Sequence, residues 1–300
     1  MTKCPACLAP IHDVDHLDLA KHLMQRADGS DIPHVRWLNQ NISRHKIEPP
    51  EVARRVAELF DLHGGSVSGW IRSRFIAQFL GKTPHPFVVA LQHPTRAVLL
   101  GYTIEHQHFL RQWVRSCAYI TAQTDQSEVI RYELDNLNTE FGGMGPGGVA
   151  HYELLLRMGE SLGYPRDRVL STPPLPATRS AIDEWNRIAR DGHWLDTMAA
   201  MHSLELIAHR GLVDEGASLH YFDPSILTSE EISGPAKAFL REGYEADVGH
   251  SERAFELVNR YAVSLDRVRD VQATTLRSFD LFDDYLLARL ERADRIDAAE

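Results

Sequence analysis

Hydrophobic residues along most of the chain recur at intervals of three and four positions, the spacing that lines one face of an α-helix. The period-two alternation typical of strands is almost absent, and proline or glycine bounds several of the helical stretches. The predicted helical segments are 50–64, 67–82, 95–123, 125–140, 147–164, 180–192, 194–211, 233–262 and 264–293. This pattern predicts an all-α bundle of about eight helices.

The first 45 residues differ from the rest of the chain in composition and pattern. They show little continuous hydrophobic periodicity and are rich in cysteine and histidine. We therefore expect two units, a small metal-binding module over residues 1–45 and a helical bundle over residues 46–300.

Cys4 and Cys7 form a Cys-x2-Cys knuckle, which can direct two thiolates at one Zn²⁺. We expect His22 to be the third ligand, and His34 or His16 to be the fourth. Such a site would stabilise a segment too small to have a core of its own. A disordered tail with incidental cysteines is the alternative. A redox motif is less favoured, because no βαβ pattern surrounds the pair.

The composition limits the classes of partner. A formal net charge of −10 argues against general nucleic-acid binding and against docking on an anionic membrane. No apolar run approaches the ~20 residues that span a bilayer, and the N-terminus does not resemble a signal peptide. We expect a cytoplasmic protein with a small-molecule substrate, and we leave room for a homodimer.

Two carboxylate–histidine pairs lie three residues apart within predicted helices. Glu105 precedes His108, and Asp247 precedes His250. Residues i and i+3 share a helix face, so each pair can approach a metal ion from one side. Facing helices that contribute such pairs are how bundles build di-iron or di-manganese sites.

The stretch 131–159, RYELDNLNTEFGGMGPGGVAHYELLLRMG, joins two predicted helices by a glycine-rich turn. Glu140 ends the first helix and His151 begins the second. The turn lacks the GxxxxGK[ST] pattern and a preceding strand, so a phosphate-binding loop is not expected. We expect the turn to bring Glu140 and His151 together over one metal ion.

The run from TIEHQHFLRQWVRSCAYI through LDNLNTEFGG to AHYELLLRMGESLG resembles the haem-oxygenase-like iron-containing oxidase and oxygenase family. Proteins of the PqqC and TenA type share the fold of that family. The resemblance covers roughly residues 60–290 and leaves the cysteine-bearing head outside. It implies a haem-oxygenase-like helical bundle.

The resemblance also implies a set of iron ligands. The positions that match the family pattern are Glu105, Glu140, His151, Asp247 and His250. The late His-x3-Asp-x2-His motif of the family departs at its first position, which is Gly243 here. One expected ligand is therefore missing, and either one or two irons fit the pattern.

Other residues near these positions are candidates for supporting roles. Glu205, His202 and His108 are possible extra iron ligands, although a structural role remains open for each. Tyr102 and Tyr244 stand close enough in sequence to the predicted ligands to hydrogen-bond a bound ligand.

Carboxylates with neutral imidazoles suit Fe(II), and open positions on the metal let O₂ bind. The resemblance implies O₂-dependent oxidation of a small amine, amino acid or amino-acid-derived metabolite by N-oxygenation, desaturation or oxidative C–C cleavage in natural-product biosynthesis. We expect a di-iron site, with a single iron as the alternative. Arg111 and Arg157 are candidates for binding a substrate carboxylate, if they are not surface residues. Two alternatives remain. One is a metal-free enzyme of the PqqC or TenA type, and the other is a non-catalytic helical partner protein.

Overall fold

The computed structural model describes residues 2–13, 15–143 and 148–299, apart from the side chains of residues 245–251. Almost all of its regular structure is helical. The hydrophobic spacing therefore predicted the secondary-structure class correctly.

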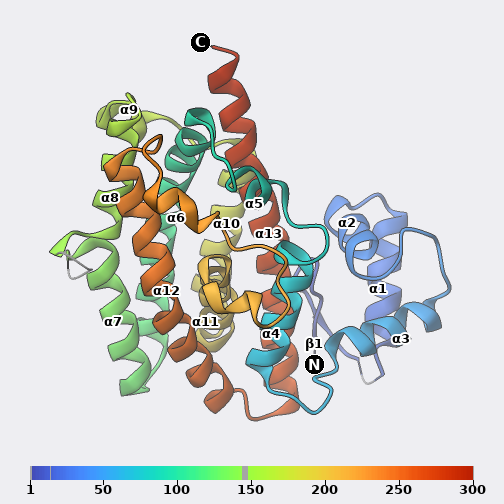
Figure 1. The fold of residues 1–300 in the computed structure, drawn as a ribbon. Helices are drawn as coiled ribbons and strands as arrows, with labels where there is room; N and C mark the ends of the chain where they lie inside the picture. Colours follow the sequence, from blue (N-terminus) through green and yellow to red (C-terminus); the bar gives the residue numbers. More distant parts are fainter. Residues whose placement is uncertain (1, 14, 144–147, 300) are drawn as a thin grey trace.

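The N-terminal part is a small hairpin followed by three helices. Strand β1 (Thr2–Lys3) pairs antiparallel with β2 (Pro10–Ile11), and α1 (Leu17–Asp28), α2 (Ile32–Asn41) and α3 (Pro49–Phe60) follow. Helix α3 packs against α1, so it stands with the first two helices at one side of the molecule (Figure 1). The expected boundary between residues 45 and 46 stays a prediction.

The remainder forms the bundle. Its α-helices are α4 (Val67–Phe75), α5 (Pro86–Ala90), α6 (Arg96–Gln123), α7 (Ser127–Phe141), α8 (His151–Ser161), α9 (Arg166–Ser171), α10 (Pro176–Asp191), α11 (Trp194–His202), α12 (Gly234–Tyr261) and α13 (Leu265–Asp297). A π-helical turn, η1 (Ile76–Leu80), extends α4, and the short 3₁₀ segments are η3 (Ser203–Ala208), η4 (Arg210–Val213) and η5 (Pro224–Thr228). The described part of the bundle thus has more helices than the eight expected, because short helices such as α5 and α9 span too few turns to show a period.

Side-chain caps set the beginnings of the long helices. The hydroxyl of Thr95 accepts a hydrogen bond from the backbone of Val98 at the start of α6. Ser264 caps α13 in the same way through the backbone N–H of Arg267. Each cap satisfies a backbone donor that the helix itself leaves unpaired.

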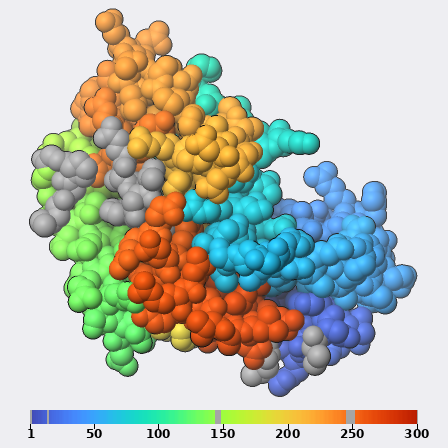
Figure 2. Space-filling model, turned by 60° about the horizontal axis from the view of Figure 1, so that its bottom comes forward, coloured from blue at the N-terminus to red at the C-terminus, as the bar shows by residue number. Residues whose placement is uncertain are grey.

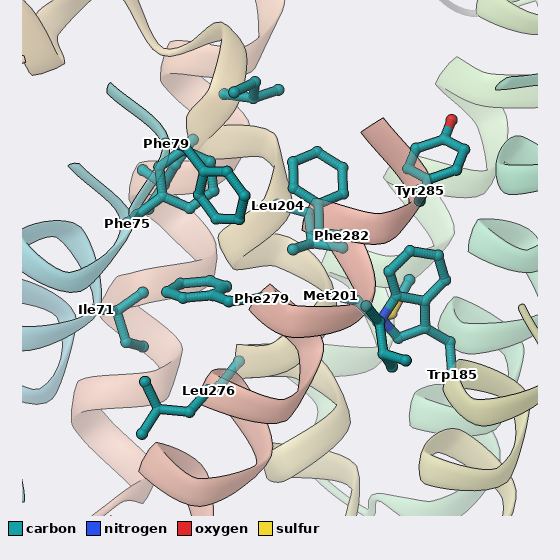
Figure 3. Close-up of a cluster of buried hydrophobic side chains, with 14 of the residues drawn as sticks. Ile71, Phe75, Phe79, Trp185, Met201, Leu204, Leu276, Phe279, Phe282 and Tyr285 are labelled. Carbon is teal, nitrogen blue, oxygen red and sulfur yellow. The ribbon is translucent and has the colours of Figure 1, made fainter. Parts of the chain in front are cut away.

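Helices α6 and α13 pack along each other in the middle of the bundle (Figure 1). The contact is close at Gly101, where an added Cβ would lie 2.2 Å from the carbonyl oxygen of Arg289. On the other side of α13, Phe279 and Phe282 meet Phe75 and Phe79 of the α4 region (Figure 3). Helix α13 is therefore buried between α6 and α4 for much of its length.

The N-terminal part is docked on the bundle by ion pairs and by apolar packing. Lys3 Nζ lies 2.6 Å from Asp196 Oδ2, and Arg36 pairs with Asp283 and Asp284 of α13. Trp37 is fully buried and belongs to the same apolar core as the bundle helices. Figure 2 shows the blue N-terminal residues on one side of the molecule and the green α7 on the other.

Within the described residues, no helix combines the length and the apolar character that crossing a membrane requires.

Candidate functional site

A partly enclosed cavity lies inside the bundle. Its walls come from helices α6, α12 and α13, from the end of α7 and the start of α8, and from the segment that follows α11. Aromatic and aliphatic side chains form most of the lining, with a few polar groups among them, as is usual for small-molecule sites. The polar or glycine residues are Tyr102, His106, Glu140, His151, Glu205, Tyr221, Gly243, Tyr244 and Arg289.

Glu140 and His151 meet on the wall of this cavity. The Nδ1 atom of His151 lies 3.2 Å from Oε2 of Glu140, and both side chains are largely buried. Gly143 and Gly148 on either side of the undescribed residues 144–147 have a φ of +71°. Glycine adopts that left-handed backbone without strain, which helps the chain to reverse between the two helices. The predicted convergence is present, and metal binding by the pair stays a prediction.

Glu105 and His108 do not line the cavity. The carboxylate of Glu105 is fully buried, accepts a hydrogen bond from Arg292 Nε at 2.8 Å and accepts another from the backbone N–H of Leu175 at 3.1 Å. His108 Nε2 lies 3.0 Å from the carbonyl oxygen of Thr172. The prediction that Glu105 joins Glu140 and His151 is therefore wrong in this structure, because Arg292 and the loop before α10 hold its carboxylate elsewhere.

The face of α6 that meets the cavity carries Tyr102, His106, Phe109 and Trp113 instead. Tyr102 lines the cavity although Glu105, the predicted ligand one turn later, does not, and the role of Tyr102 stays a prediction. His106 was missed, although it lies one helical turn after Tyr102 and so shares its face. The adjacent positions 105 and 106 point about 100° apart around a helix, so one position decides which side chain reaches the cavity.

Glu205 lines the cavity, whereas His202 lies behind it. Oε2 of Glu205 is 3.3 Å from His202 Nδ1, and Oε1 of Glu133 is 3.0 Å from His202 Nε2. Burial alone would lower the pKa of His202, but these two carboxylates outweigh burial and raise the pKa to about 10. At neutral pH the imidazole is a cation held between two carboxylates, which accounts for His202 without a metal ion.

Cys117 lies next to this pair. Its sulfur, a Glu133 oxygen and a His202 ring nitrogen all lie within 4.8 Å of one another in the fully buried interior. Burial and the nearby Glu133 raise the pKa of the Cys117 thiol well above its usual value. In this structure His202 contacts Glu133 and Glu205, so the group is a buried polar network.

Asp247 and His250 fall among the residues whose side chains the structure does not describe. Their neighbours Gly243 and Tyr244 on α12 line the cavity. The ring of Tyr244 packs against Phe222, with centroids 5.4 Å apart. Tyr244 thus stands at the cavity, and the ligand roles of Asp247 and His250 stay predictions.

Arg289 of α13 is a buried cation on the cavity wall that the sequence did not reveal. Its Nη1 donates to Tyr221 at 2.7 Å, and its Nη2 lies 2.6 Å from the Tyr285 hydroxyl and 2.9 Å from His106 Nδ1. The guanidinium also lies over the ring of Tyr102, 4.1 Å from its centroid. Because a guanidinium only donates, His106 Nδ1 must accept, which leaves the imidazole proton on Nε2.

Arg111 and Arg157, the two arginines considered for a substrate carboxylate, do not line the cavity. Arg111 donates to the hydroxyl of Tyr152 at 2.9 Å, and Arg157 pairs with Glu153 at 2.9 Å. Both are surface helix residues that interact with their neighbours.

A second group of metal-type ligands lies in the N-terminal part. The donor atoms of Cys4, Cys7, His22 and His34 all lie within 4.8 Å of one another. Cys4 Sγ is 3.6 Å and His22 Nε2 is 3.2 Å from His34 Nε2, and Cys7 Sγ is 3.5 Å from His22 Nε2. Tetrahedral Zn²⁺, with bonds of ~2.0–2.3 Å, separates neighbouring donors by roughly 3.3–3.8 Å. The four residues therefore fit a structural zinc ion.

The geometry favours His34 over His16 as the fourth zinc ligand. His34 Nδ1 lies 2.7 Å from Asp31 Oδ1, so Asp31 fixes the ring with Nε2 towards the other donors. His16 lies instead at the start of α1, with Nδ1 3.7 Å from Asp13. The hydrogen bond from Cys4 lowers the pKa of the Cys7 thiol well below its usual value, which favours a thiolate at Cys7.

Two family models match different parts of the chain. The TENA/THI-4/PQQC family model matches residues 70–293. The chain belongs to this family. A model for a C2H2-type zinc finger matches residues 1–61, which include the four zinc-type ligands. No curated protein matches the chain significantly.

Solved structures of the family fold resemble the chain at low sequence identity. A domain of unknown function with a haem-oxygenase-like fold from Shewanella denitrificans is 18% identical, has a TM-score of 0.58, and the match covers 85% of this chain and 97% of that one. A TenA family transcription regulator from Silicibacter sp. is 14% identical, with a TM-score of 0.57 and coverage of 75% and 97%. A TenA homologue from P. horikoshii is 13% identical, with a TM-score of 0.54 and coverage of 79% and 98%. The chain thus has a haem-oxygenase-like fold, as the resemblance implied.

Proposed function

We propose that the protein is an enzyme that oxidises a small organic substrate in the central cavity, with one non-haem Fe(II) ion and O₂ as co-substrate. The observation that carries the proposal is the contact between Glu140 and His151. These residues belong to two helices, and their donor atoms lie 3.2 Å apart on the wall of a largely apolar cavity.

The donor set suits such an ion. Metal–ligand bonds of ~2.1 Å separate neighbouring donors by roughly 3.0–3.4 Å, and the Glu140–His151 distance falls in that range. Carboxylate oxygen with neutral imidazole is a typical ligand combination for Fe(II), which supplies O₂ activation when bound. Glu205 lines the same cavity and would be a further donor if its carboxylate turned from His202 to the ion.

Helix α12 would supply the remaining donors. Gly243 lines the cavity, and by sequence spacing Asp247 and His250 follow it after one and two helical turns. Di-iron sites in bundles use about six protein ligands. With Glu105 bound to Arg292 and glycine at position 243, five candidates remain, and this number favours one iron over two.

The other cavity residues would bind and shield the substrate. Phe109, Leu110, Phe239 and Phe282 offer apolar surface that excludes water from the reacting groups. Burial and the charge of Arg289 lower the pKa of His106 well below its usual value, so His106 presents a neutral ring with its proton on Nε2. It would act as a hydrogen-bond donor to the substrate.

Iron content tests this proposal. Zinc-loaded protein is reconstituted anaerobically with Fe(II), desalted and analysed by plasma mass spectrometry. We expect about one iron per chain in the wild type and less than a fifth of that in Glu140→Gln and His151→Gln. Glu105→Gln is the control, because its carboxylate is also shielded from solvent but is held by Arg292. The proposal would be ruled out if the wild type bound less than half an equivalent of iron and Glu140→Ala bound the same amount.

The same contact also supports a second candidate, a metal-free enzyme in which Glu140 orients His151 as a general base. Substrate turnover distinguishes the two. An acid–base enzyme keeps its activity without iron and under argon, whereas the oxidase loses activity under either condition.

A further inference from the structure

Arg289 is a buried cation. The residue is 2% exposed, and among the residues that the structure describes no aspartate or glutamate oxygen lies within ion-pair distance of its guanidinium. The nearby Arg292, three residues later on α13, pairs with Glu105 at 2.8 Å. Burying an unpaired charge is strongly unfavourable, so a guanidinium in this position calls for a counter-charge.

The groups around Arg289 are neutral. Burial raises the pKa values of Tyr102 and Tyr285 well above the usual value, so both remain protonated phenols. His106 accepts from the guanidinium and remains uncharged. These partners stabilise the cation through hydrogen bonds and ring contacts but do not cancel its charge.

The guanidinium still has donors to offer. Three of its contacts use Nη1 and Nη2, and the buried Nε has no hydrogen-bond partner among the described residues. Because Arg289 lines the cavity, a ligand in the cavity can approach it. Arg289 is also the one lysine or arginine among the described lining residues.

The cavity is therefore electrically polar. Arg289 contacts His106, whose ring centroid lies 6.4 Å from that of His151, and His151 in turn contacts Glu140. The positive charge of Arg289 thus lies on one side of the His106 and His151 imidazoles, and the Glu140 carboxylate lies on the other side. A single cation matches a singly charged anion better than a phosphate dianion, which Glu140 and Glu205 would repel.

We propose that Arg289 binds the carboxylate of the substrate, and that the substrate is a small carboxylic acid with an apolar body. The acid group would lie at Arg289, and the atom to be oxidised would lie towards Glu140 and His151. This inference rests on the proposed function to the extent that it takes the cavity as the substrate site. It does not depend on iron.

Binding of matched acid and amide probes tests the inference. Zinc-loaded, iron-free protein is titrated by calorimetry with phenylacetate, 3-phenylpropanoate and 4-methylpentanoate, and with the neutral amide of each. We expect at least one acid to bind at least tenfold more tightly than its amide. We expect Arg289→Gln to reduce that ratio to below twofold. Equal binding of every acid and amide, no binding of any acid, or an undiminished ratio in Arg289→Gln would overturn the inference.

Three further variants make the result specific. Arg72→Gln removes another buried arginine, which pairs with Glu215 and lies outside the cavity lining, and it should keep the wild-type ratio. If Arg289→Gln does not fold, Arg289→Lys replaces it and should lower the ratio at least threefold; an unchanged ratio would contradict the inference. Glu140→Gln should lose iron but keep or increase the acid preference, because it removes a negative charge from the cavity wall, so the two proposals can fail separately.

Discussion

The zinc-type cluster and the central cavity both gather cysteine, histidine or carboxylate side chains, but the two regions differ in what competes for those side chains. In the N-terminal part, the donor atoms of Cys4, Cys7, His22 and His34 lie close together. Asp31 contacts the other ring nitrogen of His34 and so leaves its Nε2 available to a metal ion. In the bundle, Arg292 holds Glu105, and two carboxylates hold His202. Sequence spacing finds donors in both regions, but only the structure shows which are already paired.

The largest effect is expected at the zinc-type cluster. Cys7→Ser removes one thiolate, and a structural zinc ion contributes ~10–16 kcal/mol of binding free energy to such small modules. We expect zinc to fall from one equivalent to near zero, with amide exchange of residues 2–41 accelerating to the unprotected rate. His16→Ala is the control and should keep its zinc. Retained zinc in Cys7→Ser, or loss in His16→Ala, would contradict the ligand set.

The buried His202 network should give the next largest effect. His202→Gln removes a cation from between Glu133 and Glu205, and breaking a buried ion pair costs about 3–5 kcal/mol. The folded pKa is raised to about 10, above the usual 6.5, so this stabilisation is complete below pH 6.5 and is lost as the pH rises towards 10.

Urea unfolding at pH 6 and pH 9.5 measures the pH dependence. The free-energy difference between wild type and His202→Gln should be larger at pH 6. A difference that grows with pH would mean that His202 is neutral in the folded protein.

A smaller effect is expected at Glu105. Glu105→Gln keeps the shape of the side chain but removes the charge that pairs with Arg292. We expect a loss of about 1–3 kcal/mol in the free energy of unfolding, because a buried, charge-assisted hydrogen bond is weakened. Iron binding should be unchanged. A stable variant without iron would return Glu105 to the ligand set.

The sequence predicted the parts of these sites that are local along the chain. The zinc-type ligands lie within residues 4–34, and Glu140 and His151 flank one turn, so spacing alone brings their donors near each other. The short helices α5 and α9 were invisible, because a period needs several turns to appear. The helical class followed from spacing that runs through most of the chain.

The register of α6 could not be predicted. This helix is buried on nearly all sides, so its sequence lacks the polar stripe that would mark the cavity face. Glu105 and His106 are both buried neighbours, and only the packing of α13 distinguishes them. The burial of Arg289 could not be predicted for a related reason. The segment 286–295, LLARLERADR, has the mixture of charged and apolar residues that is typical of an exposed helix end.

The central claim is that the chain has two separate metal sites, one for structural zinc and one for catalytic iron. Measuring zinc and iron in the same reconstituted samples tests it most directly. We expect one zinc and about one iron in the wild type, loss of iron alone in Glu140→Gln, and loss of zinc in Cys7→Ser. A wild-type protein that keeps its zinc but takes up no iron, or a Glu140→Gln variant with full iron content, would contradict it.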